Sequence, residues 1–448
     1  MKLRSLFFGR ARSLGDENLF HHVSLIAIMA WVGLGSDGMS SSCYGPEEAY
    51  KALGGHPALS LFVALATVGT IIAICASYSQ VIAEFPTGGG GYLVASKLLS
   101  PTAGVVSGCA LLIDYVLTIT ISVASGADAL FSILPPAYQS WKLAFALGGL
   151  LALIIINLRG VKESVALLVP VFIIFLATHA FVIVYAIALK ANGLVALAHS
   201  VGHEVHTVSA EVGWFGLVAL LLRSYSMGAG TYTGIEAVSN GLPILREPRV
   251  KTGRRTMVYM GASLAITVAG LMIAYLLFNV HHESDKTLNA VLFEAVTAHW
   301  PHGISASFVW TTLASEAALL VIAAQTGFLD GPRVLANMAV DRWFPTRFAH
   351  LSDRLVTQNG ILLMGISAIV MMVVTHGSVD LLVVLYSINV FITFSLSQLG
   401  MVVHWWQIRG REPSWRQKLA INGVGLCPDA VHFDLADPRQ ILRGRLGD

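Results

Sequence analysis

The stretch WVGLGSDGMSSSCYGPEEAY (residues 31–50) interrupts a long apolar segment with three closely spaced glycines around Asp37. A second stretch, SYSMGAGTYTGIEAVSNG (residues 224–241), has the same pattern ahead of Glu236. The glycines concerned are Gly33, Gly35, Gly38, Gly228, Gly230 and Gly234. Glycine disfavours a continuous helix by up to about 1 kcal/mol per residue. Both segments are therefore predicted to be broken membrane helices, with these glycines as hinges.

The two stretches lie about 195 residues apart, and each opens a set of five apolar segments. This arrangement is typical of transporters built from two inverted repeats, whose substrate site lies where the helices are broken. An alternative is that the glycines serve only for close helix packing, which is common in membranes. Two breaks at matching positions, each with a carboxylate in it or beside it, favour the substrate site.

The composition supports a membrane protein with many spans. Of the 448 residues, 55% are hydrophobic and 12% are charged, whereas soluble globular proteins carry about 25% charged residues. The mean hydropathy is +0.70, and the apolar stretches do not alternate as the strands of a β-barrel do. We therefore predict an all-α integral membrane protein. The net charge of +2 gives no reason to expect a nucleic-acid partner, and no catalytic, cofactor or phosphate-loop motif points to an enzyme.

Ten spans are predicted from runs long enough to cross about 30 Å of hydrocarbon. They cover residues 23–53, 57–86, 102–132, 143–158, 164–190, 213–241, 256–280, 304–328, 359–376 and 379–404. The expected organisation is a short N-terminal segment, a transport core made of two repeats, and a tail. These parts cover residues 1–22, 23–404 (repeats 23–190 and 213–404) and 405–448.

The distribution of basic residues predicts the orientation. Twenty of the 28 lysines and arginines fall in the N-terminal segment, the even-numbered loops and the start of the tail. The alternate loops hold only Lys51, Lys142, Lys190 and Lys286. Because positively charged loops stay in the cytoplasm, the N-terminus is predicted to be cytoplasmic.

Acidic residues inside spans are unfavourable by about 2.5 to 3.5 kcal/mol and therefore indicate function. Asp37 is the strongest candidate, because unwound backbone near it leaves carbonyl oxygens free to coordinate a cation. The alternative role for Asp37 is a helix N-cap for the second half of the span. Glu236 follows the second break and could carry a proton, or it could make only a structural hydrogen bond. Arg223 is expected to be structural, and Glu316 is left without an assigned role.

Span three contains DYVLTITIS (residues 114–122), which places Asp114, Thr118 and Ser122 on one helix face with Tyr115 beside them. This stripe is a candidate part of the same site. The alternative is that the hydroxyls of Thr118 and Ser122 only donate hydrogen bonds to the backbone carbonyls four residues before them in the same helix. Tyr386, in span ten, is more often a core aromatic than a ligand.

At these residues the sequence resembles a known family. YTGIEAVSNGLPILREPR (residues 232–249) is similar to the sixth span of the amino acid-polyamine-cation superfamily. GLGSDGMSSSCYGPEEAY (residues 33–50) is similar to the first-helix signature of KimA-type potassium importers, relatives of the KUP potassium transporters. The resemblance implies a LeuT-like fold, proton-coupled potassium uptake without a cofactor, and a location in the bacterial inner membrane.

The resemblance also implies a role for each matching position. The implied potassium ligands or gate residues are Asp37, Tyr44, Asp114, Tyr115, Thr118, Ser122, Thr233 and Tyr386. Among these, Asp37, Thr118, Ser122 and Thr233 would hold the ion itself, and Glu236 would carry the coupled proton. An electrostatic argument agrees: amino acid permeases bind the substrate carboxylate at the first break, where the charge of Asp37 would repel it.

One departure concerns the C-terminal segment. Family members continue through spans eleven and twelve into a cytoplasmic domain that supports dimerisation and regulation by cyclic di-AMP. Here the start of span eleven resembles residues 421–425, and a polar segment follows. We therefore expect a truncated or frameshifted product whose homodimer is in doubt. The remaining alternatives are an amino acid or polyamine permease, and a non-transporting receptor or inactive product.

Overall fold

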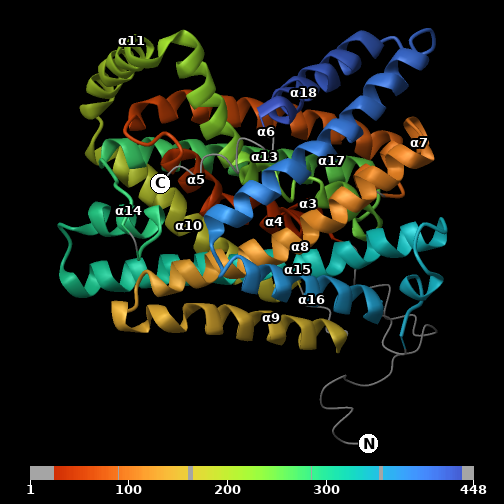
Figure 1. Ribbon diagram of the computed structural model, residues 1–448, viewed down its shortest axis with the longest axis horizontal. Helices are drawn as coiled ribbons and strands as arrows, with labels where there is room; N and C mark the ends of the chain where they lie inside the picture. The colour runs from red at the N-terminus through yellow and green to blue at the C-terminus, as the bar shows by residue number, and fades with distance from the viewer. Residues whose placement is uncertain (1–24, 89, 160–164, 284, 353–356, 436–448) are drawn as a thin grey trace, which may run out of the picture.

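The computed structural model describes residues 25–88, 90–159, 165–283, 285–352 and 357–435. Within these residues the chain is helical, with two isolated β-bridges and no strand. Eight helices are long and apolar enough to cross a membrane, so the prediction of an all-α, multi-pass membrane protein is confirmed (Figure 1). The predicted N-terminal segment 1–22 and the last part of the predicted tail, 436–448, lie outside the described residues.

Eight helices form the long spans. They are α6 (Ser60–Glu84), α8 (Pro101–Phe131), α9 (Lys142–Leu158), α10 (Val165–Leu189), α11 (Gly193–Met227), α13 (Arg249–Leu277), α15 (His302–Val340) and α17 (Val379–Gln407). The two other predicted spans are also helical. The ninth predicted span is α16 (Gln358–Val374), which has 17 residues. The first predicted span is divided into α3 (Ala27–Gly33), α4 (Gly35–Ser40) and α5 (Gly45–Lys51). The other α-helices of the described part are α7 (Gly90–Leu98), α12 (Ala237–Asn240), α14 (Leu288–Thr297) and α18 (Trp415–Leu435), and short 3-10 turns lie between several of the helices.

Two groups of helices surround the divided first span. Helix α13 packs along α6, and α15 packs along α8, while α9 and α16 pack on the α8–α15 pair. Figure 1 shows α9 on the outer side of this second group, and α3, α4 and α5 follow one another through the middle of the bundle. The side chains at this centre are fully buried, among them Met39, Tyr232, Met260 and Phe394. The divided span thus lies where both groups meet.

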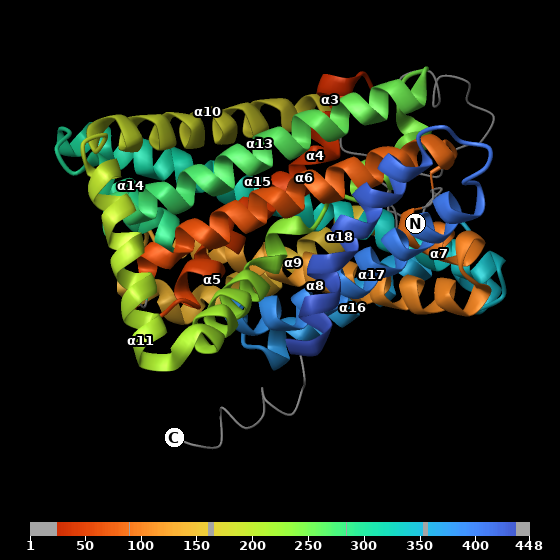
Figure 2. The ribbon, with the colours of Figure 1, turned by 90° about the horizontal axis from the view of Figure 1, so that it is seen from above.

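Helix α11 joins the two halves of the chain. Its first part crosses the end of the bundle where α10 ends, and the chain then turns back into the bundle (Figure 2). The turn lies at Gly213, whose φ of 74° is left-handed and is readily adopted only by glycine. The predicted start of the sixth span at residue 213 therefore coincides with this turn.

Helix α18 lies within the segment predicted as a tail and packs against α17 and α6. Its Asn422 is fully buried, accepts a hydrogen bond from Ser77 (2.6 Å) and donates one to the side chain of Gln80 (2.8 Å). A buried amide needs such partners, because an unsatisfied polar group is unfavourable by about 1 to 3 kcal/mol. The start of α18 is thus attached to the second span by specific polar contacts.

Candidate functional site

The first span is interrupted between Gly33, where its first helix ends, and Gly45, where its last helix begins. Helix α3 ends at Gly33, and α4, which begins at Gly35, contains Gly38. A short 3-10 turn, η1 (Ser41–Cys43), follows, and Tyr44 leaves helical geometry at φ −130° before α5 begins. The N-cap of α5 is thus Tyr44, and neither α4 nor α5 has a side-chain cap. The alternative role of Asp37 as an N-cap is therefore not observed.

The break in the sixth span is sharper. Helix α11 passes into a 3-10 turn, η4 (Gly228–Tyr232), which contains two of the predicted hinge glycines, Gly228 and Gly230. Thr233 then leaves helical geometry, with φ −70° and ψ 152°, and Gly234 has a left-handed φ of 76°. After Glu236 the chain resumes as the short helix α12. The largest change of direction thus occurs at Thr233 and Gly234.

The two breaks touch each other through their backbones. A Cβ atom added to Gly234 would lie 2.6 Å from the Gly38 nitrogen and 2.8 Å from the carbonyl carbon of Asp37. The Ser41 hydroxyl lies 2.8 Å from the carbonyl oxygen of Thr231. Such close approach requires a residue without a side chain at the contact. The fold therefore brings the two predicted broken stretches into one site.

Ser41→Ala is expected to lower the thermal stability of the detergent-solubilised protein, because it removes a hydroxyl that contacts the Gly38 carbonyl of its own turn (2.5 Å) and also the Thr231 carbonyl of the other break (2.8 Å). The expected loss is about 1 to 2 kcal/mol, the range for a buried hydrogen bond with its unpaired partner. Ser42→Ala is the matched control, since the Ser42 hydroxyl bonds only the Met39 carbonyl of its own turn (2.7 Å). Equal melting temperatures for the two variants would contradict this contact.

Side-chain oxygens from four elements surround the breaks. The hydroxyl of Tyr44 lies 3.4 Å from that of Thr233, and the hydroxyl of Thr118 lies 2.7 Å from that of Tyr386. Ser122 is buried, and its hydroxyl has no hydrogen-bond partner among the described residues. Neither the Thr118 nor the Ser122 hydroxyl donates a hydrogen bond to the carbonyl four residues before it. The alternative role of these hydroxyls, in bonds within their own helix, is therefore not observed among the described contacts.

Three buried carboxyl groups lie within electrostatic reach of one another: those of Asp37, Asp114 and Glu236. One oxygen each of Asp114 and Glu236 is buried without a hydrogen-bond partner in the described part of the chain. A fourth acid, Asp330 of α15, is also near and is paired with Arg333 at 3.1 Å. The site thus carries more buried acids than bases, together with oxygens that have free lone pairs.

Two contacts of the site were not indicated by the sequence. Asn240 donates a hydrogen bond to the hydroxyl oxygen of Tyr115 (2.8 Å), one of the predicted potassium ligands. This oxygen therefore already has a partner within the protein. The ion pair between Asp330 and Arg333 lies on α15, the helix of Glu316, to which the sequence assigned no role. Arg223, by contrast, is exposed and pairs with no acid among the described residues. Its expected structural role therefore involves no intramembrane ion pair in the described region.

The comparison with protein families is decisive for the class of protein. The profile of the amino acid permease family matches residues 23–427, which include both breaks and all predicted site residues. The chain belongs to the amino acid permease family. The predicted superfamily is thereby confirmed, and permeases of this kind are transporters, not enzymes.

Two curated relatives of the permease agree with this placement. It is 31% identical over 406 residues to the potassium transporter KimA of Bacillus subtilis (strain 168), and this alignment covers 90% of this chain and 64% of that protein. It is 27% identical over 193 residues to the low-affinity putrescine importer PlaP of Escherichia coli (strain K12), covering 42% of this chain and 38% of the relative. A crystal structure of an Eremococcus coleocola manganese transporter matches with a TM-score of 0.45 and 14% identity, covering 95% of this chain and 97% of the other. The permease thus spans less than two thirds of the length of these curated relatives.

Proposed function

We propose that the chain imports potassium through the site between the two breaks and that proton symport drives the uptake. The observation that carries this proposal is the excess of buried acidic and hydroxyl oxygens over buried cations around Asp37. Oxygen atoms that replace a hydration shell are what a dehydrated potassium ion requires. The similarity to KimA supports the same substrate.

The ion would be coordinated by oxygens from the two breaks and from span three. Asp37 contributes charge, and Thr233, Thr118 and Ser122 contribute hydroxyl groups. Two of these hydroxyls already contact tyrosines, because Thr118 bonds Tyr386 and Thr233 lies near Tyr44. A hydroxyl that donates its proton to such a neighbour keeps lone pairs for a cation. We therefore assign the tyrosines to orienting these ligands and to the gate.

Glu236 is the proposed carrier of the coupled proton. It is buried directly after the second break, and its Oε2 has no hydrogen-bond partner among the described residues. A carboxylate in this position has either to bind a cation or to be neutralised by a proton, because an isolated buried charge is strongly unfavourable. Proton and potassium binding next to the same hinge would couple the two fluxes.

Alternating access is proposed to follow from movement of spans one, two, six and seven against spans three, four, eight and nine. An ionic cluster at one end of the site supports a gate. Lys51 of α5 contacts Glu47 (2.8 Å) and Glu48 (3.0 Å) on its own helix and Asp380 of α17 (3.4 Å). A polar cavity of about 310 Å³ lies beside this cluster. With the N-terminus in the cytoplasm, as the basic residues predict, this end would be extracellular, and the contact between Lys51 and Asp380 would form part of the outer gate.

An amino acid or polyamine permease is the second candidate. The specific observation in its favour is that the buried carboxylates of Asp37 and Glu236 would also suit an organic ammonium group, and the partial similarity to a putrescine importer agrees. A zwitterionic amino acid suits the site less well, because Asp37 adds negative charge where its carboxylate would bind.

Complementation in a bacterial strain without potassium uptake tests the proposal. We expect the chain to restore growth at low external potassium, and a protonophore to abolish the accompanying uptake. Growth restored by putrescine transport in a polyamine-dependent strain, without rescue of potassium uptake, would instead support the second candidate.

A further inference from the structure

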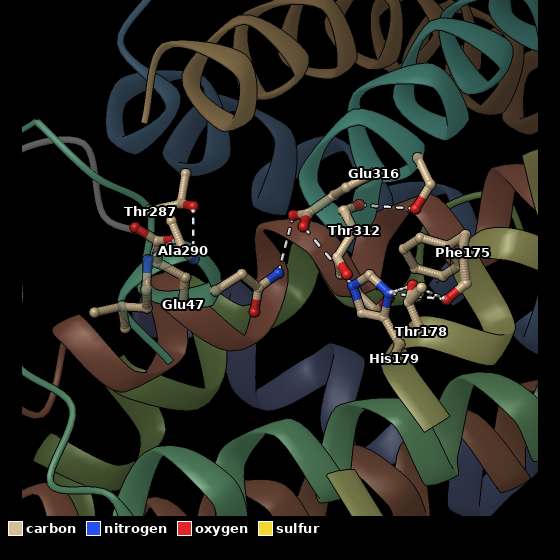
Figure 3. Close-up of polar contacts among 12 residues, drawn as sticks. Glu47, Phe175, Thr178, His179, Thr287, Ala290, Thr312 and Glu316 are labelled. Atoms are coloured by element: carbon tan, nitrogen blue, oxygen red, sulfur yellow. Dashed lines mark hydrogen bonds and ion pairs between the residues drawn. The ribbon is translucent and has the colours of Figure 1, made fainter. Parts of the chain in front are cut away.

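A second group of buried titratable side chains lies outside the proposed potassium site. His179 of α10 and Glu316 of α15 face each other with Nε2 and Oε2 3.7 Å apart, and both side chains are 1% exposed. Figure 3 shows the imidazole ring and the carboxyl group pointing toward one another between these two helices. Neither residue has a role in the mechanism proposed above. Two ionisable groups buried so completely are unfavourable in a membrane unless they have a purpose.

The hydrogen bond on the far side of the ring determines where the histidine proton lies. His179 Nδ1 is 2.9 Å from the carbonyl oxygen of Phe175. A carbonyl oxygen can only accept, so Nδ1 carries a hydrogen and donates it. In the neutral ring Nε2 is then a bare acceptor, and it has no hydrogen-bond partner in the described residues.

The carboxyl group is oriented in the same way. Glu316 Oε1 accepts a hydrogen bond from the side-chain amide of Asn289 (2.9 Å), and the Asn289 oxygen accepts one from the hydroxyl of Tyr275. The other oxygen, Oε2, is buried without a hydrogen-bond partner among the described residues. It is therefore Oε2 that faces the bare nitrogen of His179. Two acceptors face each other here, and a single proton placed between them would satisfy both.

We propose that His179 and Glu316 together form a proton-binding site that holds one shared proton and contributes to coupling. The shared proton lies between Nε2 of His179 and Oε2 of Glu316, which are 3.7 Å apart. The protonated pair forms a hydrogen bond between α10 and α15, and loss of the proton leaves two facing lone pairs. Its part in coupling rests on the proposed function, whereas the binding of the proton does not.

The first turn of α14 connects this pair to the half-helix that closes the potassium site. Asn289 holds Glu316 through its side chain, and the preceding residue, Leu288, donates its backbone N–H to Glu47 of α5 (3.0 Å). Figure 3 shows Glu47 beside the start of α14, on the opposite side of that turn from Glu316. A change at the pair would therefore be passed to α5 through two neighbouring residues. This link gives the proton a route to influence the outer end of the first span.

Few other titratable groups face the pair. From η1 the thiol of Cys43 lies within hydrogen-bonding reach of the Glu316 carboxyl group, and from α13 the hydroxyl of Tyr275 lies within its electrostatic reach. The carboxyl group of Glu47 of α5 also lies within electrostatic reach of Tyr275. The rings of Phe175 and Phe293 cover the imidazole. Among the described residues, no lysine or arginine forms an ion pair with Glu316. The charge of its carboxylate is therefore neutralised only when the pair binds a proton.

Glu316→Gln is the variant that tests the site. Glutamine keeps the size of the side chain, can still accept from Asn289, and donates an N–H toward Nε2, so it imitates the protonated state. The first measurement is proton uptake by the purified protein in detergent when the solution is acidified. We expect the variant to bind one proton fewer than the parent chain.

The second measurement is rubidium uptake into proteoliposomes, with and without an inward proton gradient. We expect Glu316→Gln to keep rubidium exchange and to lose the acceleration by the gradient. Gln325→Leu is the matched control, because Gln325 lies on the same helix in a buried amide pair with Asn157 (2.8 Å). That variant removes a polar contact of α15 without removing a titratable group, so its proton count and its gradient response should be those of the parent.

The two measurements separate the possible failures. An unchanged proton count in Glu316→Gln would overturn the proton-binding site. A reduced count with full acceleration by the gradient would overturn its part in coupling. If the parent chain transports no rubidium but the count falls by one, the site stands and the proposed function fails. Should Glu316→Gln not fold, His179→Gln serves for the same two measurements. Its amide can donate to Oε2 of Glu316 and so takes the place of the shared proton, and the expected result is again one bound proton fewer than in the parent chain.

Discussion

Asp37→Asn is expected to reduce potassium uptake by at least about 100-fold, which corresponds to about 2.7 kcal/mol. The substitution keeps the shape of the side chain and one oxygen atom but removes its charge. A pair of unit charges about 4 Å apart interacts by about 4 kcal/mol at an effective dielectric constant of 20. Asp37 is 3% exposed and touches the other break through its backbone. Its charge is therefore screened little by water, and the ion should feel most of it.

Initial rates of rubidium uptake in whole cells measure this effect. Asp341→Asn is the control of the same chemistry, since Asp341 lies at the exposed end of α15 and accepts a hydrogen bond from Tyr92. The control should retain uptake. A rate for Asp37→Asn within a fewfold of the control would show that Asp37 is not a ligand of the transported ion.

Gly234→Ala is expected to abolish uptake and to lower the yield of monodisperse protein. Two effects add at this position. The left-handed φ of 76° is unfavourable by about 1 to 2 kcal/mol for a residue with a side chain. In addition, the new methyl group would overlap the backbone of Asp37 and Gly38, which has no flexible atom to move aside. The two breaks would have to separate, and the potassium ligands would separate with them.

Gly54→Ala separates the two effects. Gly54 has a φ of 59°, but an added Cβ would meet no atom within 4 Å. This variant therefore experiences the strain of the left-handed backbone without the overlap. Size-exclusion chromatography and rubidium uptake should show a nearly normal protein for Gly54→Ala and a defective one for Gly234→Ala. Similar behaviour of both variants would contradict the close contact between the breaks.

The glycine pattern was sufficient to predict which spans are broken. It predicted the position of the second break well, because Gly234 adopts a conformation that other residues avoid. It was less informative in the first span, where Gly33, Gly35 and Gly38 lie in helical turns. There the break extends to Tyr44, and the serine hydroxyls bond carbonyl groups three residues before them. Helical glycines and irregular serines are not distinguishable by composition alone.

Contacts between distant segments were beyond the reach of the sequence. The bond between Thr118 and Tyr386 joins residues 268 positions apart, and the pair of His179 and Glu316 joins two spans that neither motif includes. A lone histidine in an apolar helix gives no periodic or spacing signal. Glu316 could be recognised as unusual for its charge, but only the packing of α10 on α15 identifies its partner.

The most direct test of the central claim is potassium accumulation by the purified chain in proteoliposomes that begin with equal potassium on both sides. We predict that an inward proton gradient drives potassium inward against its growing gradient and that a protonophore abolishes this accumulation. A folded protein that accumulates putrescine or an amino acid under these conditions, while potassium stays at equilibrium, would contradict the account.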